Sequence, residues 1–157
     1  MLTQRTRSYI FFPAAALLAG GIASFLTRDY FSVYKTLNQP IFAPPAWLFP
    51  VVWTVLYLLM GIGAARIAAS PDSLRRGKAL NIFVAQLVFN FFWSLIFFNT
   101  GSYGLALLWL SVLWVQILVL IFRFRNVDRA AALLQIPYLL WVTFAWYLNF
   151  GVWRLNG

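Results

Sequence analysis

The chain of 157 residues is 63% hydrophobic and 20% aromatic, and only 10% of its residues are charged. This composition excludes a soluble domain, which needs a polar surface, and favours a single membrane domain. The net charge of +9 does not indicate nucleic-acid binding, because the basic residues stand at the edges of apolar runs, where they act as topology signals.

Five apolar runs are long enough to cross a hydrocarbon core of about 30 Å, at about 1.5 Å per residue. Their approximate bounds are 9–26, 47–69, 79–98, 103–122 and 130–150. We therefore predict an all-α integral membrane protein, in which one domain over residues 1–157 forms a five-transmembrane-helix bundle.

The first run, residues 9–26, has two interpretations. Basic residues precede it and small residues fill 19–24, as in a signal peptide with its cleavage region, although the run is long for one. Its small residues Ala16, Gly20 and Ser24 are also spaced by four, which suits close packing of helices in lipid.

Between the first and second runs lies an apolar segment rich in proline. Proline removes a backbone donor and restricts the residue before it, so this segment is not ordinary helix. Pro50 fits the first turn of the next helix, where its missing N–H costs little. We predict a stiff lid over the outer mouth of the bundle, plugged by Ile41, Phe42 and Trp47. The predicted lid residues are Pro40, Phe42, Pro44, Pro45 and Trp47.

The third and fifth runs carry uncharged polar groups on one helical face. The third run has Gln86, Asn90, Trp93, Ser94 and Phe97, and the fifth has Trp141, Ala145, Leu148 and Asn149. In the second run, Trp53 and Tyr57 stand one turn apart. An asparagine inside lipid needs a partner, so these groups either bond helix to helix or line a pocket for a flat ligand.

Basic residues are unevenly divided between the two ends of the predicted bundle. One end carries Arg5, Arg7, Arg66, Arg75, Arg76, Lys78, Arg123, Arg125 and Arg129, and the other carries Arg28, Lys35 and Arg154. The positive-inside rule therefore places the N-terminus and the second and fourth loops in the cytoplasm, if the membrane is a plasma or inner membrane.

Acid–base catalysis is nearly excluded by the residue types present. No run has a charge in its middle, and the chain has neither histidine nor cysteine, so we predict no metal site, no disulfide and no proton relay. What remains is aromatic surface with a few neutral polar groups, which favours binding over catalysis.

Three blocks resemble the TspO/MBR family of tryptophan-rich sensory proteins and translocator proteins, also called the peripheral-type benzodiazepine receptor family. They are "YKTLNQPIFAPPAWLFPVVWTVLYLLMGIGAARI" (34–67), "QLVFNFFWSLIFF" (86–98) and "PYLLWVTFAWYLNFGVWR" (137–154). The resemblance implies a five-helix bundle with a pocket closed by the first loop. It also implies porphyrin or haem as ligand, isoquinoline or benzodiazepine-type ligands, no obligatory cofactor and, in many members, a homodimer.

Pocket positions follow from this resemblance together with the helical faces. They are Tyr34, Trp53, Tyr57, Asn90, Trp93, Ser94, Phe97, Leu110, Trp141, Ala145 and Leu148. The chain departs from the family pattern at Val33, Gln39 and Phe42, so that the loop lacks one charge and two indoles. Phe150 stands where the family's cholesterol motif has tyrosine, which argues against sterol recognition there.

We therefore predict a membrane protein that binds tetrapyrroles for sensing, sequestration or transport. One alternative is a photo-oxidative enzyme that degrades porphyrins, with Trp93 and Trp141 as its redox-active indoles. Another is passive transport of porphyrins or sterols, since the sequence shows no charged coupling residue and no inverted repeat. A last alternative is a regulatory partner of other membrane proteins, docked through the basic loops.

Overall fold

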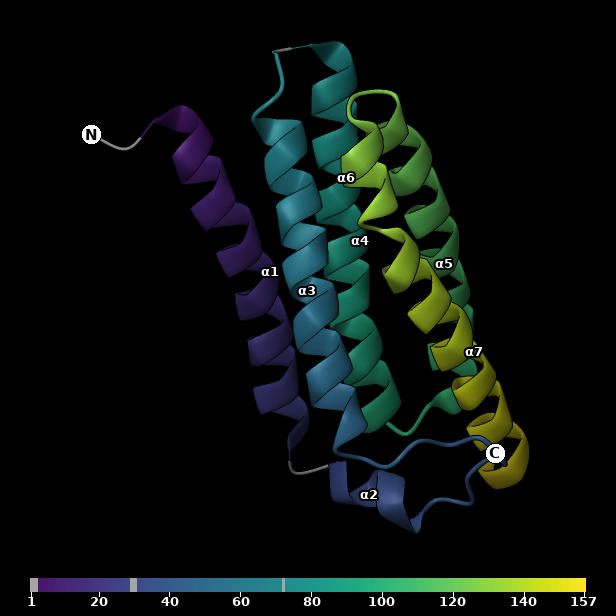
Figure 1. Ribbon diagram of the computed structural model, residues 1–157. Coiled ribbons are helices and arrows are strands. Elements are labelled where there is room, and N and C mark those ends of the chain that lie inside the picture. The colour runs from purple at the N-terminus through teal and green to yellow at the C-terminus, as the bar shows by residue number, and fades with distance from the viewer. Residues whose placement is uncertain (1–2, 29–30, 72) are drawn as a thin grey trace.

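The computed structural model describes residues 3–28, 31–71 and 73–157, and in these ranges it contains helices and no strand. The long helices stand side by side, with the two chain ends at opposite ends of the bundle (Figure 1). The helices are α1 (Gln4–Thr27), α2 (Phe31–Thr36), α3 (Leu48–Ala68), α4 (Leu74–Phe98), α5 (Tyr103–Arg125), α6 (Arg129–Leu133) and α7 (Ile136–Asn156).

Five segments of the described chain are long and apolar enough to cross a membrane: α1, α3, α4, α5 and the α6–α7 pair. The predicted all-α, five-helix membrane class is therefore confirmed. The protein is an integral, multi-pass membrane protein.

Two helices begin earlier than the apolar runs suggest, because polar caps extend them past the hydrophobic edge. The Thr3 hydroxyl accepts from the Thr6 backbone N–H at 3.2 Å, so α1 begins at Gln4. The Ser73 hydroxyl accepts from the Arg76 N–H at 3.1 Å, so α4 begins at Leu74. Each cap satisfies a backbone donor that the first helical turn leaves open.

The fifth run, predicted as one helix over 130–150, is instead divided into α6 and α7. Pro137 lies in the first turn of α7, and proline disfavours helical geometry at the residue before it and lacks an N–H, so the chain breaks just before it. At the break the Gln135 amide donates to the Ala131 carbonyl at 3.3 Å, and it packs where Gly63 of α3 has no side chain. The break is thus held inside the bundle.

Close packing of α1 on α3 depends on another glycine. A Cβ on Gly61 would meet the backbone of Pro13 and Phe12, so only glycine allows the two helices to approach this closely. α3 also packs on α4, and α5 packs between α4 and α7. The buried core between these helices includes Met60, Phe83 and Leu113.

The proline segment between α2 and α3 lies across the end of the bundle and joins the end of α7 (Figure 1). The Asn38 N–H donates to Asn156 Oδ1 at 2.9 Å, and Asn156 Nδ2 donates back to the Asn38 carbonyl at 2.9 Å. Pro40 packs on Gly151, where a Cβ would lie 2.7 Å from the proline ring.

The residues that were predicted to plug the mouth of the bundle lie on the outside of this segment. Ile41, Phe42 and Trp47 are 91%, 71% and 66% exposed, so their side chains do not fill the mouth. Pro44 and Pro45 lie between Phe42 and Trp47 in the chain, and the Pro45 carbonyl accepts from the Leu48 N–H, which leads into α3. The exposure follows from the attachment at Asn38 and Pro40, which holds one edge of the segment and leaves the other outside.

Candidate functional site

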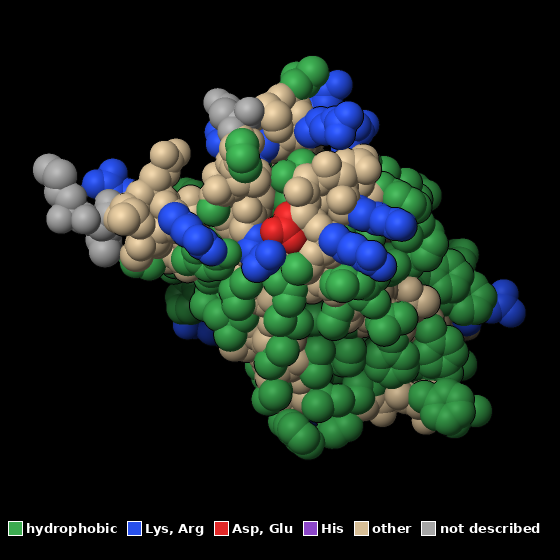
Figure 2. All heavy atoms as spheres, turned by 45° about the horizontal axis from the view of Figure 1, so that its top comes forward, with side chains coloured by type: hydrophobic (Ala, Val, Ile, Leu, Met, Phe, Trp, Pro, Cys, Tyr) green, Lys and Arg blue, Asp and Glu red, His purple; other side chains and the backbone are tan. Residues whose placement is uncertain are grey.

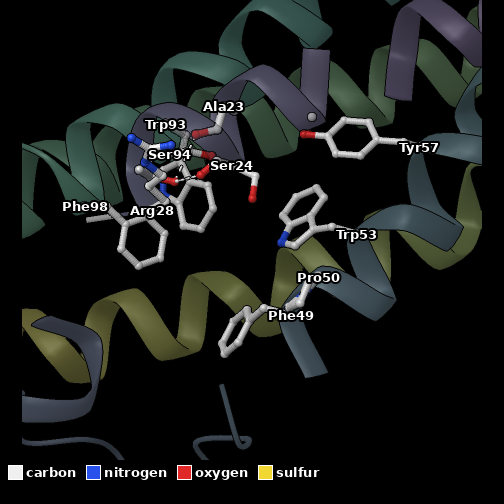
Figure 3. Close-up of a pocket in the computed structure, with 12 residues that line it drawn as sticks. Ala23, Ser24, Arg28, Phe49, Pro50, Trp53, Tyr57, Trp93, Ser94 and Phe98 are labelled. Carbon is white, nitrogen blue, oxygen red and sulfur yellow. Dashed lines mark hydrogen bonds between the residues drawn. The ribbon is translucent and has the colours of Figure 1, made fainter. Parts of the chain in front are cut away.

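A cavity of about 300 Å³ lies between α1, α3 and α4, at the end of the bundle that carries α2 (Figure 3). It is lined by Gly20, Ala23, Ser24, Thr27, Arg28, Phe49, Pro50, Trp53, Tyr57, Trp93, Ser94 and Phe98. Its inner wall reaches the interior of the bundle, because Ala23, Tyr57 and Trp93 are all buried. The volume is at the lower end of the range of small-molecule sites.

Aromatic rings form the long wall of the cavity. The Trp53 ring lies 5.5 Å from the Tyr57 ring and 6.3 Å from the Trp93 ring, between centroids, with interplanar angles of 32° and 37°. Trp53 also meets Tyr138 of α7 edge-on at 6.2 Å. Rings held at these separations present a broad apolar face to a planar guest.

The opposite wall is made of small side chains of α1. Gly20 faces the Tyr57 ring so closely that a Cβ would collide with it, while Ala23 and Ser24 border the open space. The cavity therefore exists because small residues face large aromatic ones across the α1–α3 and α1–α4 contacts.

A chain of hydrogen bonds leads away from the cavity into the core. Tyr57 Oη donates to Asn90 Oδ1 at 2.6 Å, and Asn90 Nδ2 donates to Tyr138 Oη at 2.8 Å. Tyr138 Oη then donates to Gln86 Oε1 at 2.9 Å, and Gln86 Nε2 donates to the Phe83 carbonyl at 3.0 Å. All the side chains that carry this chain are buried and satisfied.

Asn149 of α7 also forms its hydrogen bonds within the bundle. Asn149 Oδ1 accepts from Trp93 Nε1 at 3.2 Å, and its amide donates to the Tyr103 carbonyl at 2.8 Å. Asn90 and Asn149 therefore bond helix to helix, and of the two interpretations left open by the sequence the structure supports this one. They set the orientation of Tyr57 and Trp93, which do line the cavity.

The mouth of the cavity contains one cation and several hydroxyl groups. The Arg28 guanidinium lies 4.2 Å from the centroid of the Phe25 ring, and Arg28 is a lining residue together with Ser24 and Ser94. The described residues that line the cavity include no acid, while Asp29, next to Arg28, lies outside the described residues. A ligand carboxylate that reached this mouth would meet a cation and neutral donors.

Only part of the predicted site lines this cavity. Trp53, Tyr57, Trp93 and Ser94 do so. Leu110, Ala145 and Leu148 are buried in helix contacts instead, and Phe97 packs 5.8 Å from Trp93. They are not lining residues, so the structure does not bring all eleven predicted positions into one cavity.

Phe49 separates two more predicted residues from the cavity. Its ring lies 5.3 Å from Tyr34 and 5.9 Å from Trp141, between centroids, and it also lines the cavity itself. Burial raises the pKa of the Tyr34 hydroxyl, which stays neutral at physiological pH. Trp141 Nε1 is buried and has no hydrogen-bond partner among the described residues. The Phe49 ring is thus in contact with this indole and also lines the cavity.

The wall that sequence reasoning missed belongs to α1. Gly20 and Ser24 had appeared as small residues suited to helix packing, and Thr27 and Arg28 follow them on the lining face. A stripe of small residues indicates that another helix packs closely, but it does not predict at which level the contact gives way to a hollow. Within the described residues, no cluster of three histidine, cysteine or acidic side chains offers a metal site.

Comparison with known proteins gives a consistent result. The model of the TspO/MBR family matches residues 10–154. A tryptophan-rich sensory protein of Cereibacter sphaeroides is 41% identical over 123 residues, which cover 78% of this chain and 76% of that protein. The tryptophan-rich protein TspO of Chlorobaculum tepidum is 40% identical over 126 residues, 78% of each. The translocator protein of Bos taurus is 31% identical over 142 residues, 88% of this chain and 84% of that protein.

Proposed function

The chain belongs to the TspO/MBR family, and from this premise we propose that it binds a planar, mostly apolar tetrapyrrole of the porphyrin class in the α1–α3–α4 cavity. The observation that carries the proposal is the wall of Trp53, Tyr57 and Trp93 rings facing a hollow made by small residues. Stacking adds about 0.5–1.5 kcal/mol per ring pair beyond the burial of apolar area.

The polar end of the cavity suits the acidic edge of such a ligand. Arg28 at the mouth would hold a propionate, while the macrocycle would lie against Trp53. A complete macrocycle needs more room than the present hollow, and Phe49 is the ring whose movement would supply it toward Trp141. The free indole N–H of Trp141 would then meet the ligand.

The biological role that follows is sensing, sequestration or movement of the bound pigment, as the sensory and translocator names of the relatives suggest. We propose no acid–base step, since the described lining residues include no carboxylate and no imidazole. A homodimer stays a prediction.

Titration of the purified protein with protoporphyrin IX, followed by the ligand's own absorption and fluorescence anisotropy, tests the site. We expect Trp53→Leu to weaken binding about tenfold, because it removes stacked and buried ring surface. Trp114→Leu is the matched control, since that indole lies between α5 and α7 and should leave affinity unchanged. Equal affinities of the wild type and the Trp53 variant would refute the assignment.

We also propose that the end carrying α2 faces away from the cytoplasm, as the unequal division of basic residues predicts. The chain has no cysteine, so single cysteines can be introduced as reporters. In sealed cells, a membrane-impermeant maleimide should label Lys35→Cys and spare Gly77→Cys. The reverse pattern would invert the orientation.

A further inference from the structure

The end of the bundle opposite α2 carries a dense group of basic side chains (Figure 2). Of the acidic residues in the described chain, Asp128 is the single one, and its carboxylate pairs with Arg66 at 2.8 Å. Figure 2 shows this acid surrounded by lysine and arginine side chains. No second acidic residue stands among the described residues.

Two of these cations converge on a cleft between neighbouring helices. Arg75, in the first turn of α4, and Arg123, in the last turn of α5, line a hollow of about 220 Å³ together with Asn126. Within the described residues neither arginine forms a side-chain hydrogen bond or ion pair. Asp72 precedes Arg75 by three positions and lies outside the described residues.

The positive charge of the cleft comes from its side chains. The cleft lies between the first turn of α4 and the last turn of α5, and these two helix ends have dipoles of opposite sign. Two guanidinium groups and an amide offer several donors to one anion, and guanidinium geometry matches phosphate oxygens. Basic residues that only set the membrane topology must lie at this end of the bundle, but they need not line a common cleft.

Exposed apolar side chains stand directly beside these arginines. Leu74 is 75% exposed and Phe122 is 62% exposed, and each precedes one of the two arginines in the chain. Both helices continue from here into membrane-spanning segments. An anion bound in the cleft would therefore lie at the membrane surface, and the apolar side chains beside it would contact lipid. This is the position of a phospholipid headgroup.

We propose that this cleft is a binding site for the phosphate headgroup of an anionic phospholipid, such as phosphatidylglycerol. Arg75 and Arg123 hold the phosphate, Asn126 donates to the headgroup oxygens, and the acyl chains lie along α4 and α5. Basic pockets between transmembrane helices select anionic lipids through this combination of charge and interfacial position.

Native mass spectrometry of the protein, released from an equimolar mixture of phosphatidylglycerol and phosphatidylcholine, tests the site. We expect the wild type to retain phosphatidylglycerol preferentially, and R75Q/R123Q to lose about tenfold or more of that preference. The matched control is R5Q/R7Q, which removes the same charge at the same end but leaves the cleft intact. Its preference should stay close to that of the wild type.

Two further measurements and one comparison of the variants above keep the result decisive. Asn126→Leu, which leaves the charge unchanged, should weaken retention without altering the circular dichroism spectrum, and it replaces the double variant if that variant does not fold. Equal losses in R75Q/R123Q and R5Q/R7Q would overturn the site in favour of diffuse charge. Displacement of the retained lipid by millimolar inorganic phosphate would overturn the lipid as occupant and assign the cleft to free phosphate.

Discussion

The α1–α3–α4 side and the α5–α7 side of the bundle both contain tryptophan, yet they use it differently. Between α5 and α7, Trp114 Nε1 donates to Thr143 at 2.8 Å and Trp146 Nε1 donates to Ser111 at 2.9 Å. These indoles bridge helices and border a groove on the surface. On the α1 side, Trp53 faces small residues across a cavity that reaches buried side chains.

The difference shows that tryptophan content alone does not make a binding site. An indole that meets a hydroxyl on the next helix becomes a structural bridge. An indole that meets glycine, alanine or serine is left facing space. For Trp53, Trp114 and Trp146, the residue across the helix contact decides the role. Trp93 has both roles, because it lines the cavity and donates to Asn149. This comparison can be tested from both sides.

The largest effect is expected where the cavity wall joins the core. Asn90→Leu would remove the acceptor of the Tyr57 hydroxyl and the amide donor to the Tyr138 hydroxyl. We expect a loss of about 2 kcal/mol in the free energy of unfolding, because unsatisfied buried polar groups keep their desolvation cost. Thermal unfolding in detergent measures it. Wild-type stability in this variant would show that the buried network does not support the wall.

The next effect concerns the proline segment that lies across the α2 end of the bundle. Gly151→Ala places a methyl group 2.7 Å from Pro40, so the proline must move away from α7. We expect about 1 kcal/mol of destabilisation, as overpacking usually costs, and faster release of protoporphyrin in stopped flow. Gly21→Ala is the control, since a Cβ there meets nothing within 4 Å. An unchanged release rate would separate this segment from ligand exchange.

The two sides of the bundle also show how much of the structure can be predicted from the sequence. The helices were predictable, because an apolar run of bilayer length has few other stable forms in lipid. The Trp53–Tyr57–Trp93 wall was predictable from helical spacing and family resemblance. The opposite wall, formed by α1, was not predictable, because the same small residues of α1 form a tight contact at one level and a hollow at another. Trp141 was placed in the pocket, but a single ring, Phe49, separates it.

On the α5–α7 side we expect smaller effects. Trp114→Phe and Trp146→Phe each remove one indole–hydroxyl bond and keep most of the ring. Bonds between helices in lipid average about 0.6 kcal/mol, so each variant should lower the free energy of unfolding by about that amount. Protoporphyrin affinity should not change. Weaker binding in either variant would contradict the division of the bundle into a bridging side and a binding side.

The smallest effect is expected at the Arg66–Asp128 pair, which joins the two sides at the basic end. Burial alone would raise the pKa of Asp128, but the Ala131 N–H and the Arg66 guanidinium lower it below its ordinary value. A lowered pKa in the folded state means that the carboxylate stabilises the fold above about pH 4, its unfolded pKa. That contribution disappears as the pH falls through the folded pKa.

Both side chains of the pair are partly exposed, so the contribution should stay below about 0.5 kcal/mol. Asp128→Asn should therefore be slightly less stable than the wild type at pH 7, and the two proteins should converge as the pH falls below about 4. Unfolding in detergent, measured across this range, gives the difference between them. Equal stability of the two proteins at every pH would assign the role of Asp128 to capping α6 rather than to its charge, since asparagine and aspartate both accept from the Ala131 N–H.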